Sequence, residues 1–244
     1  MPGAGAVTVI IPTYNEAESI DAVVTELPRA IVGRVIVVDG GSRDGTQQRA
    51  RSAGAEVIDV GRGYGRACLA GAQAAQPDDI LVFMDGDGAD DPTAIAAMVE
   101  AIRSGTYDFV IASRARGKRE PGSMAAHQLL AGHVAGRLTK LLYGVRYTDM
   151  CAFRAIRREI LLKLGMREMT YGWNLEMQMR AARAGLRVLE LPVDYRKRLG
   201  GESKVAGSLR GSLKAGLRIT ATFARIALEP AGARMGRRAP RQTS

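Results

Sequence analysis

Cysteine, aromatic side chains and long apolar runs are all scarce in this sequence. The 244 residues include two cysteines, Cys68 and Cys151, which lie far apart and without metal-ligand spacing. We therefore expect reduced thiols in a cytosolic protein and no disulfide framework. The N-terminal stretch MPGAGAVTVIIP lacks the charged and long apolar regions of a signal peptide. No stretch reaches the roughly 18 to 20 apolar residues that a membrane span needs, so no spanning segment is expected.

Acidic residues are scarce at the C-terminal end. Residues 1–195 carry 23 Lys or Arg and 23 Asp or Glu, whereas residues 196–244 carry 12 Lys or Arg and two Glu. The formal net charge of +10 therefore belongs to the C-terminal part alone. This asymmetry indicates a neutral body with a basic appendage that meets an anionic partner. An unstructured tail without a partner is the alternative.

The apolar residues are grouped in short runs, and helical patterns lie between them. Such runs are typical of parallel strands that helices cover on both faces, so the sequence predicts an α/β domain with a mainly parallel sheet. The expected strands span residues 7–11 (ended by Pro12), 35–38, 56–60, 80–84, 108–112 and 188–193. The expected helices span about 16–27, 45–53, 65–75, 92–103, 124–142 and 156–164, with one more in TYGWNLEMQMRAARAG that ends at Gly185.

Polar or glycine-rich residues follow five of these strands in succession. In open parallel sheets, ligands bind outside the carboxyl ends of the strands. Five such ends together indicate a binding site more strongly than any single motif does. They carry residues 13–16, Asp39, the glycine-rich loop at 61–65, the stretch MDGDGADDP at 84–92, and the pair Ser113 and Arg114.

The stretch MDGDGADDP places four carboxylates within seven residues, directly after an apolar run. Asp85 and Asp87 are two residues apart, so on an extended segment both point the same way. Both could reach one hard divalent cation, or one could reach the cation and the other a ligand hydroxyl. Asp90 and Asp91 precede a proline and a helix, so we expect one of them to be the N-cap of that helix. A merely solvated acidic turn is the alternative.

The loop from Gly61 to Arg66 carries glycines in the pattern G-x-G-x-G. A dinucleotide-binding fold needs G-x-G-x-x-G and an acidic residue about twenty positions later. The glycine spacing here differs, the loop follows the third expected strand, and no acidic residue about twenty positions later has the required role. A loop whose backbone at Gly63 and whose arginines approach a phosphorylated ligand is the better interpretation.

Six short motifs occur in one order along the chain. They are PTYNE (12–16), VVDGGSRDGT (37–46), MDGDGADDP (84–92), Ser113 with Arg114, Phe153 with Arg154, and GGESK (200–204). In this order they resemble the family-2 glycosyltransferases, and most closely the polyprenyl-phosphate (dolichyl-phosphate) sugar transferases, over about residues 7–205. The resemblance implies a GT-A fold, a nucleotide-diphosphate sugar donor of the GDP-mannose or UDP-glucose type, and Mg²⁺ or Mn²⁺.

The resemblance also implies roles for individual residues. Asp85 and Asp87 match the D-x-D motif, whose second Asp usually binds the metal on the diphosphate. The chain departs from the family at Ala89, where a Gln often serves as an additional metal ligand; Asp90 or water could take the place of that ligand. The other matches are Pro12, Tyr14 and Glu16 to the nucleotide-contact segment, Asp39 to the acid that contacts the base, and Arg114 and Lys204 to basic residues near the phosphates.

The acceptor decides whether the reaction needs a base. The family implies inversion at the anomeric carbon. A phosphate monoester, with a second pKa of about 6, is already largely ionised at pH 7 and needs only positioning by basic residues. A sugar or protein hydroxyl needs a general base. Glu176 and Asp149 are the candidate bases, and each could equally be a structural hydrogen-bond acceptor.

The segment 205–229 combines apolar and basic residues at helical spacing. Two series recur every four residues: Leu209, Leu213 and Leu217, and Arg210, Lys214 and Arg218. They predict an amphipathic helix on an anionic membrane surface, or else a helix packed on the body with a solvated basic face. No recognition motif or aromatic stacking platform accompanies the arginines, so nucleic acid is not an expected partner.

We therefore expect a GT-A domain at 1–204, a basic helix at 205–229 and a disordered basic tail at 230–244. The expected protein is a metal-dependent, inverting glycosyltransferase in the cytoplasm, peripheral at the inner face of the membrane, with a polyprenyl phosphate as acceptor. Two alternatives stay open: a glycosyltransferase with a soluble hydroxyl acceptor, and a nucleotide-sugar-binding protein with a degenerate catalytic site.

Overall fold

The computed structural model describes residues 5–123, 126–200 and 220–229, with the backbone alone for 126–131. Its strands are β1 (Val7–Thr13), β2 (Arg34–Asp39), β3 (Glu56–Asp59), β4 (Ile80–Phe83), β5 (Phe109–Ser113), β6 (Arg154–Arg157) and β7 (Val188–Pro192). Its helices are α1 (Ile20–Thr25), α2 (Thr46–Ser52), α3 (Tyr64–Ala74), the short 3₁₀ helix η1 (Pro92–Ala94), α4 (Ile95–Arg103), α5 (Ala126–Tyr143), α6 (Arg158–Lys163) and α7 (Trp173–Arg183). Residues 220–228 are also helical.

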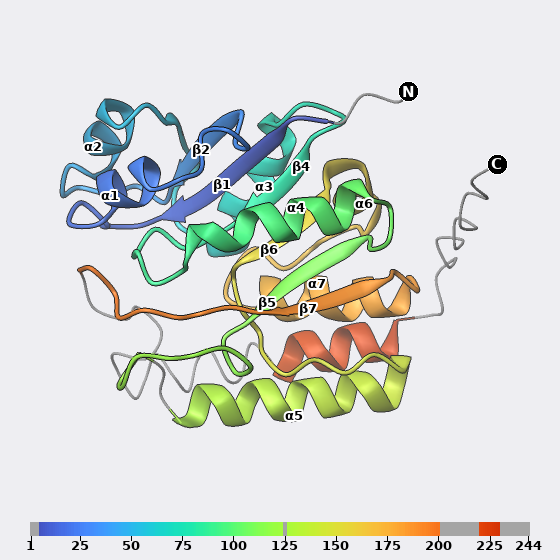
Figure 1. Ribbon diagram of the computed structural model, residues 1–244. Helices are drawn as coiled ribbons and strands as arrows, with labels where there is room; N and C mark the ends of the chain where they lie inside the picture. Colours follow the sequence, from blue (N-terminus) through green and yellow to red (C-terminus); the bar gives the residue numbers. More distant parts are fainter. Residues whose placement is uncertain (1–4, 124–125, 201–219, 230–244) are drawn as a thin grey trace.

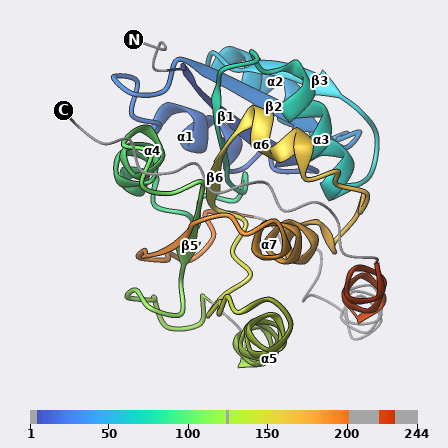
Figure 2. The ribbon, with the colours of Figure 1, turned by 90° about the vertical axis from the view of Figure 1, so that its right-hand side faces the viewer.

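The described strands form one mixed sheet in the order β3-β2-β1-β4-β6-β5-β7. Neighbouring strands are parallel except at β6, which runs antiparallel to β4 and to β5. Helices α1 and α4 lie on one face of the sheet, and α3 and α7 lie on the other (Figure 1 and Figure 2). The prediction of a mainly parallel α/β sheet with helices on both faces is confirmed.

The central strands are buried along their whole length, as their uninterrupted apolar runs predict. This holds for β1, β4 and β5, since helices on both faces bury the side chains that point in either direction. Fully burying one such side chain contributes roughly 1.5–3 kcal/mol. Gly71 lets α3 approach the sheet, because a Cβ there would lie 2.5 Å from Cγ2 of Ile10.

Strand β1 continues through Pro12 to Thr13, so the prediction that Pro12 ends the strand is wrong. The Ile10 carbonyl accepts a hydrogen bond from Met84 N–H at 3.2 Å, which shows that even-numbered residues of β1 face β4. Pro12 therefore faces the side of β4, whose pairing with β1 ends at Ile10 and Phe83. The N–H that proline lacks costs no ladder hydrogen bond at this point.

Strand β6 occupies residues that we predict to lead into a helix at about 156; the helix itself, α6, begins at Arg158. The strand has four residues and an arginine at each end, so it shows no alternation that would mark it in the sequence. Arg154 is fully buried and donates to the carbonyl oxygens of Ala152 and Asn174 at 3.3 and 3.1 Å. Backbone carbonyls thus take the place of water around this guanidinium.

Helix α5 lies beyond the β7 edge of the sheet, along α7 and next to residues 220–228 (Figure 1). Ala135, Leu175, Met179 and Ile226 form a small apolar cluster between these helices, separate from the main core. Among the described helices, none combines the length and the apolar character that crossing a bilayer requires.

Candidate functional site

The D-x-D stretch leaves the carboxyl end of β4 and folds against the end of β1. The carbonyl oxygen of Gly86 accepts a hydrogen bond from Ser19 Oγ at 2.7 Å, and a Cβ on Gly86 would lie 3.0 Å from Cγ2 of Thr13. Asp87 is almost fully buried, and its Oδ1 accepts from Ala89 N–H at 3.0 Å. The stretch is therefore a packed part of the sheet edge, which argues against a merely solvated acidic turn.

The two later aspartates of the stretch have different positions. Asp91 accepts hydrogen bonds from the backbone N–H and the hydroxyl of Thr93 at 3.1 and 2.9 Å, so it caps η1 as predicted. Asp90 is not the cap: it is buried and its Oδ2 accepts from Asp85 N–H at 3.1 Å. The chain turns back at this point because Gly88 adopts φ of +77°, which glycine reaches without strain.

Three carboxylates consequently crowd the end of β4. Burial, then the neighbouring charge of Asp87, raises the pKa of Asp85 to about 6. Burial, then the charges of Asp85 and Asp87, raises the pKa of Asp90 to about 8. Like charges this close favour protonation or a counter-cation, so the site is prepared for a positive ligand.

We expect Asp90→Asn to stabilise the metal-free protein at high pH. The folded-state pKa of Asp90 is about 8 and its unfolded value about 3.9, so between these values the folded state binds one more proton than the unfolded state. The free energy of unfolding of the wild type then falls as pH rises through this window. In the variant, the free energy of unfolding should fall less between pH 5 and pH 9 than in the wild type, by roughly 1 kcal/mol or more. Urea denaturation at the two pH values measures this difference. Parallel pH profiles for both proteins would contradict the assignment.

The segment at residues 195–199 lies over the D-x-D stretch, and sequence reasoning did not assign it a role. Arg198 Nε lies 3.0 Å from Oδ2 of Asp87, and Leu199 N–H donates to the Asp87 carbonyl at 2.9 Å. Arg196 N–H donates to the Ala89 carbonyl at 3.0 Å. Ala89 is thereby fully enclosed. The one available signal was the run of tyrosine and basic residues directly after the last strand.

Arg114 follows β5 and is held by Asp149. The backbone N–H and Nε of Arg114 donate to Oδ2 of Asp149 at 3.0 and 2.8 Å, and its NH2 nitrogen donates to Oδ1 at 2.8 Å. Burial acts to raise the pKa of Asp149, but the hydrogen bonds from Arg114 outweigh it and hold that pKa below its usual range. The guanidinium carbon lies 4.9 Å from the centre of the Tyr195 ring. These contacts favour the structural alternative for Asp149, which orients Arg114 beneath the 195–199 segment.

Asp39 ends β2 fully buried and organises the turn that follows. Its carboxylate accepts from Gly41 N–H, Ser42 N–H and Gln47 Nε2 at 2.9, 2.7 and 2.9 Å. Burial acts to raise the pKa of Asp39, but hydrogen bonds led by that of Ser42 lower it overall. The contact between Asp39 and a nucleotide base stays a prediction.

The predicted nucleotide-contact segment meets the glycine-rich loop at the same edge. The Arg62 guanidinium lies 4.5 Å from the centre of the Tyr14 ring and donates to the Tyr14 hydroxyl. Glu16 continues this segment, and its N–H donates to Thr46 Oγ1 at 2.9 Å. Gly63 has φ of +141°, and a Cβ there would lie 2.8 Å from the carbonyl oxygen of Met169. Gly63 is therefore needed for close packing, and its contact with a ligand stays a prediction.

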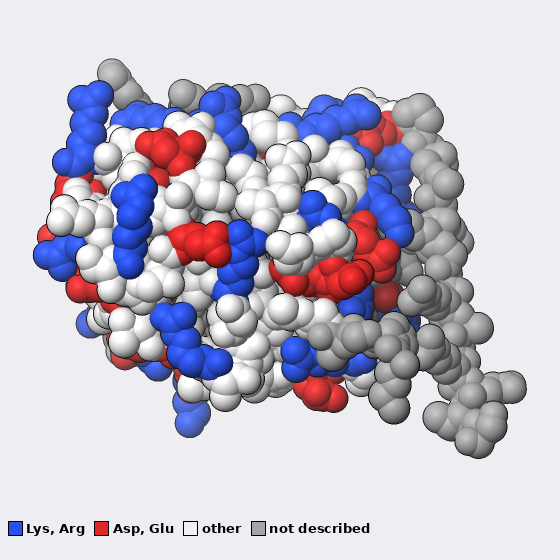
Figure 3. All heavy atoms as spheres, turned by 90° about the horizontal axis from the view of Figure 1, so that it is seen from above, with Lys and Arg blue, Asp and Glu red and all other residues white. Residues whose placement is uncertain are grey.

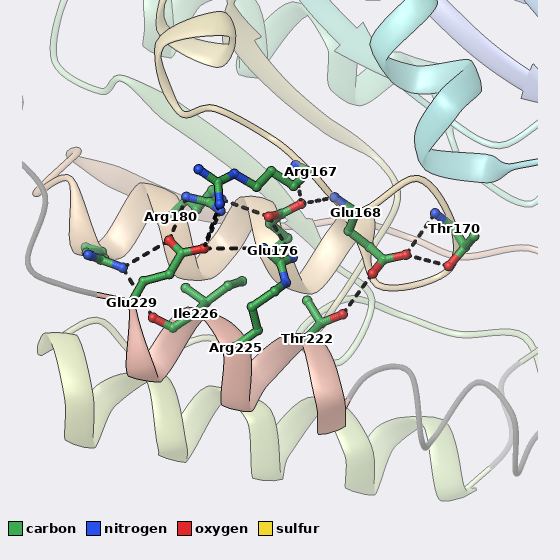
Figure 4. A network of polar contacts seen from close by, with 10 residues as sticks. Arg167, Glu168, Thr170, Glu176, Arg180, Thr222, Arg225, Ile226 and Glu229 are labelled. Atoms are coloured by element: carbon green, nitrogen blue, oxygen red, sulfur yellow. Dashed lines mark hydrogen bonds and ion pairs between the residues drawn. The ribbon is translucent and has the colours of Figure 1, made fainter.

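Glu176 lies on α7, on the side that faces the helix at 220–228 (Figure 4). Its hydrogen bonds in the described part of the chain go to residues 167, 168, 180 and 225, and none goes to the D-x-D stretch or the 195–199 segment. Glu176 is fully buried. Its carboxylate accepts from the N–H groups of Arg167 and Glu168 at 2.9 and 2.5 Å, and from Arg180 and Arg225 at 2.9 and 3.0 Å. Burial acts to raise the pKa of Glu176, but these donors lower it overall. This environment favours the structural alternative for Glu176.

The described end of the predicted basic helix packs on the body. Thr222 and Ile226 are buried, and Glu229 receives ion pairs from Arg180 at 2.9 Å and Arg183 at 3.3 Å (Figure 4). For residues 220–229 the structure thus matches the alternative of a helix packed on the body. Lys204, the rest of the predicted helix at 205–219 and the predicted tail at 230–244 lie outside the described residues.

The carboxylates after β4 fit a divalent cation that has few protein ligands. Asp87 already faces a positive group, the Arg198 guanidinium. No three His, Cys, Asp or Glu side chains within the described part of the chain are arranged to hold a metal ion between them. Asp85 and Asp87 would therefore share the ion with diphosphate and water oxygens, a ligand set that Mg²⁺ commonly has at nucleotide sites.

Sequence comparisons agree on one family. The family profile described as Glycosyl transferase family 2 matches residues 8–165. An uncharacterized glycosyltransferase of Mycobacterium tuberculosis is 38% identical over 213 residues, 85% of this chain and 93% of that protein. The undecaprenyl-phosphate mannosyltransferase of Micrococcus luteus is 34% identical, over 84% of this chain and 89% of its own. The polyprenol monophosphomannose synthase of Mycolicibacterium smegmatis is 32% identical, over 82% and 81%.

Solved structures share the architecture. The glucosyl-3-phosphoglycerate synthase of Mycobacterium tuberculosis, in complex with Mn²⁺, uridine diphosphate and phosphoglyceric acid, superimposes with a TM-score of 0.73 over 93% of this chain and 80% of that chain. The two chains are 22% identical, so this likeness concerns the fold alone. It confirms the predicted GT-A fold.

Proposed function

Because this chain belongs to glycosyl transferase family 2, we propose that it is an inverting glycosyltransferase that moves a sugar from a nucleotide diphosphate to a polyprenyl phosphate. The mannosyltransferase and mannose synthase compared above carry undecaprenyl phosphate and polyprenol in their names. Both align with this chain over more than four fifths of either length. These names support a lipid-phosphate acceptor. The nucleotide-diphosphate donor, of the GDP-mannose or UDP-glucose type, is part of the proposal.

The choice of a phosphate acceptor rests on one observation: arginines already pair with both candidate bases. Asp149 is engaged by Arg114, Glu176 is engaged by Arg180 and Arg225, and both carboxyl groups have a lowered pKa. A hydroxyl acceptor needs a base that takes its proton, and either residue would have to leave its arginine to do so. A phosphate acceptor is already ionised near pH 7, so it requires cations and no base.

On the donor side, Asp85 and Asp87 would hold Mg²⁺ or Mn²⁺. When bound, such an ion supplies charge stabilisation for the departing nucleotide diphosphate. Arg198 contacts Asp87, and Arg114 lies over the ring of Tyr195. These arginines concentrate positive charge next to the carboxylates, where the negative charge of the leaving group develops.

The proposed acceptor is a lipid, so the proposed place of work is the inner, cytoplasmic face of the membrane. Both cysteines, Cys68 and Cys151, are free and buried, as expected for thiols in a reducing compartment. The predicted membrane contact through residues 205–229 remains part of this proposal.

Sugar transfer in vitro tests the proposal. The full chain is incubated with radiolabelled GDP-mannose or UDP-glucose, Mg²⁺ or Mn²⁺, and a short-chain polyprenyl phosphate in detergent. We expect a labelled product that partitions into organic solvent, and no product from the matched polyprenol without phosphate. Transfer to a soluble alcohol alone would support the hydroxyl-acceptor alternative. Donor binding without transfer to any acceptor would support a binding protein.

A further inference from the structure

Helix α5 exposes an apolar stripe on the side that faces away from the protein. Val134, Leu138, Leu141 and Leu142 are 46%, 40%, 81% and 46% exposed. Their positions i, i+4, i+7 and i+8 place them on one side of an α-helix. A contiguous exposed apolar surface of this kind marks an interaction site in a folded protein.

The opposite side of α5 is already packed, so the exposed stripe is not a misplaced core face. Ala135 and Thr139 are buried, and a Cβ on Gly136 would lie 1.7 Å from the Tyr147 carbonyl oxygen. The tyrosine at the end of α5, Tyr143, donates from its hydroxyl to the Ile226 carbonyl at 3.5 Å. The helix is thus fixed to the body by one face and presents the other.

Basic side chains border the apolar stripe. Arg137 and Lys140 are exposed on α5, and together with Leu141 and Arg146 they line a hollow beside it. No Asp or Glu occurs from Ala126 to Tyr143. The upper end of the molecule, by contrast, interleaves acidic and basic side chains (Figure 3).

We propose that the outer face of α5 (Val134, Arg137, Leu138, Lys140, Leu141 and Leu142) docks on an anionic lipid bilayer. Leucines bordered by Lys and Arg are the composition of a helix that lies in the interface plane, with apolar side chains in the acyl boundary and cations at the headgroups. This inference extends the proposed function and rests on it for the lipid nature of the acceptor.

Charge favours a bilayer over a second copy of the chain as the occupant. A symmetric dimer through this face would place the same patch on both sides of the interface. Arg137 and Lys140 of one copy would then meet the same cations of the other, without an acidic residue on α5 to compensate them. Like charges across an interface oppose association, whereas anionic headgroups attract the same side chains.

Helix α5 packs on the segment that holds Asp149, and Asp149 contacts Arg114 of the candidate site. Gly132 packs on the segment that precedes Met150: a Cβ there would lie 3.4 Å from the Cα of Asp149. Asp149 in turn orients Arg114 through three hydrogen bonds. A bilayer under α5 would therefore bring a lipid phosphate to the side of the molecule that carries this arginine.

Vesicle flotation of the full chain tests the docking face without donor or acceptor. Vesicles of phosphatidylcholine with 30% phosphatidylglycerol are compared with phosphatidylcholine alone. We expect wild type to float with the anionic vesicles and Leu138→Glu/Leu141→Glu to bind at least about tenfold more weakly. Arg137→Gln/Lys140→Gln should lose about fivefold for each cation. Leu162→Glu, which changes a leucine of α6 that is 38% exposed, is the matched control and should float like wild type.

Two further readouts keep this result separate from the proposed function. Transfer to a detergent-solubilised acceptor should be unchanged in Leu138→Glu/Leu141→Glu, since neither residue belongs to the site. Equal flotation of this variant and wild type, or no flotation of wild type, would overturn the docking face even if sugar transfer is observed. A wild-type dimer in light scattering that this variant dissociates would assign the face to a second copy and would also overturn it.

Discussion

Asp87→Asn is expected to lower sugar transfer by about 100-fold or more, the size of effect seen when a charge-stabilising group is removed from an active site. Asp87 is the carboxylate of the D-x-D stretch that pairs with a guanidinium in the structure: its Oδ2 lies 3.0 Å from Arg198 Nε. Asparagine keeps the size of the side chain and can still accept from Ala89 N–H. It removes the negative charge that Mg²⁺ or Mn²⁺ requires.

The measurement combines turnover with binding. Donor affinity is determined by calorimetry with and without Mn²⁺, and metal-dependent binding should be lost in the variant. Asp91→Asn is the matched control, because Asp91 belongs to the same stretch but caps η1. Asparagine caps a helix about as well as aspartate does, so this variant should keep most of its turnover and nearly all of its stability. Metal-dependent turnover at wild-type rates in Asp87→Asn would remove this residue from the site.

Glu176→Gln is expected to lower the free energy of unfolding by about 3 kcal/mol or more, in the range for breaking a buried ion pair. Glu176 has no exposed surface. Its carboxylate accepts hydrogen bonds from two backbone N–H groups and from two arginines. An amide in its place leaves Arg180 and Arg225 without a full countercharge. The glutamine side chain also replaces one carboxylate oxygen, a hydrogen-bond acceptor, by an NH₂ group, which is a donor and would face other donors. The helix at 220–228 should loosen first, because Arg225 ties it to Glu176.

Urea denaturation measures this loss, and hydrogen exchange of residues 220–228 locates it. Glu159→Gln is the matched control: Glu159 forms an i,i+4 pair with Lys163 at 3.2 Å, and both side chains are more than half exposed. It should cost at most about 0.5 kcal/mol. At a temperature where Glu176→Gln stays folded, we expect its turnover number and pH profile to match those of wild type. A large loss of turnover without a loss of stability would instead make Glu176 the general base.

Much of the site was predictable because parallel strands carry their functional residues at one edge. The apolar runs at 7–11 and 80–84 are typical of buried parallel strands, so the residues after them were expected to meet. Asp85 and Asp87 follow from this rule, as does the meeting of Tyr14 with the glycine-rich loop. Asp91 was predictable as a cap, because the proline after it marks the first residue of a helix.

Contacts between residues far apart in the chain were not predictable. Arg198 lies more than a hundred residues from Asp87, and nothing in its neighbourhood distinguishes it from the other basic residues there. Asp90 resembles a cap as well as Asp91 does, and only the turn at Gly88 directs it back to Asp85. Strand β6 was hidden because its arginines break the pattern by which a buried strand is identified.

The sequence by itself determined the family, the sheet and the carboxylates at its edge, because these depend on local patterns and on short motifs with fixed spacing. Only the tertiary structure decided which charges meet. It paired Asp149 with Arg114 and Glu176 with Arg180 and Arg225, which favours structural roles for both carboxylates over the role of a general base. It also left the leucines of α5 on the outside. Burial and pairing set the pKa and the accessibility of a side chain, and both depend on residues that only folding brings together.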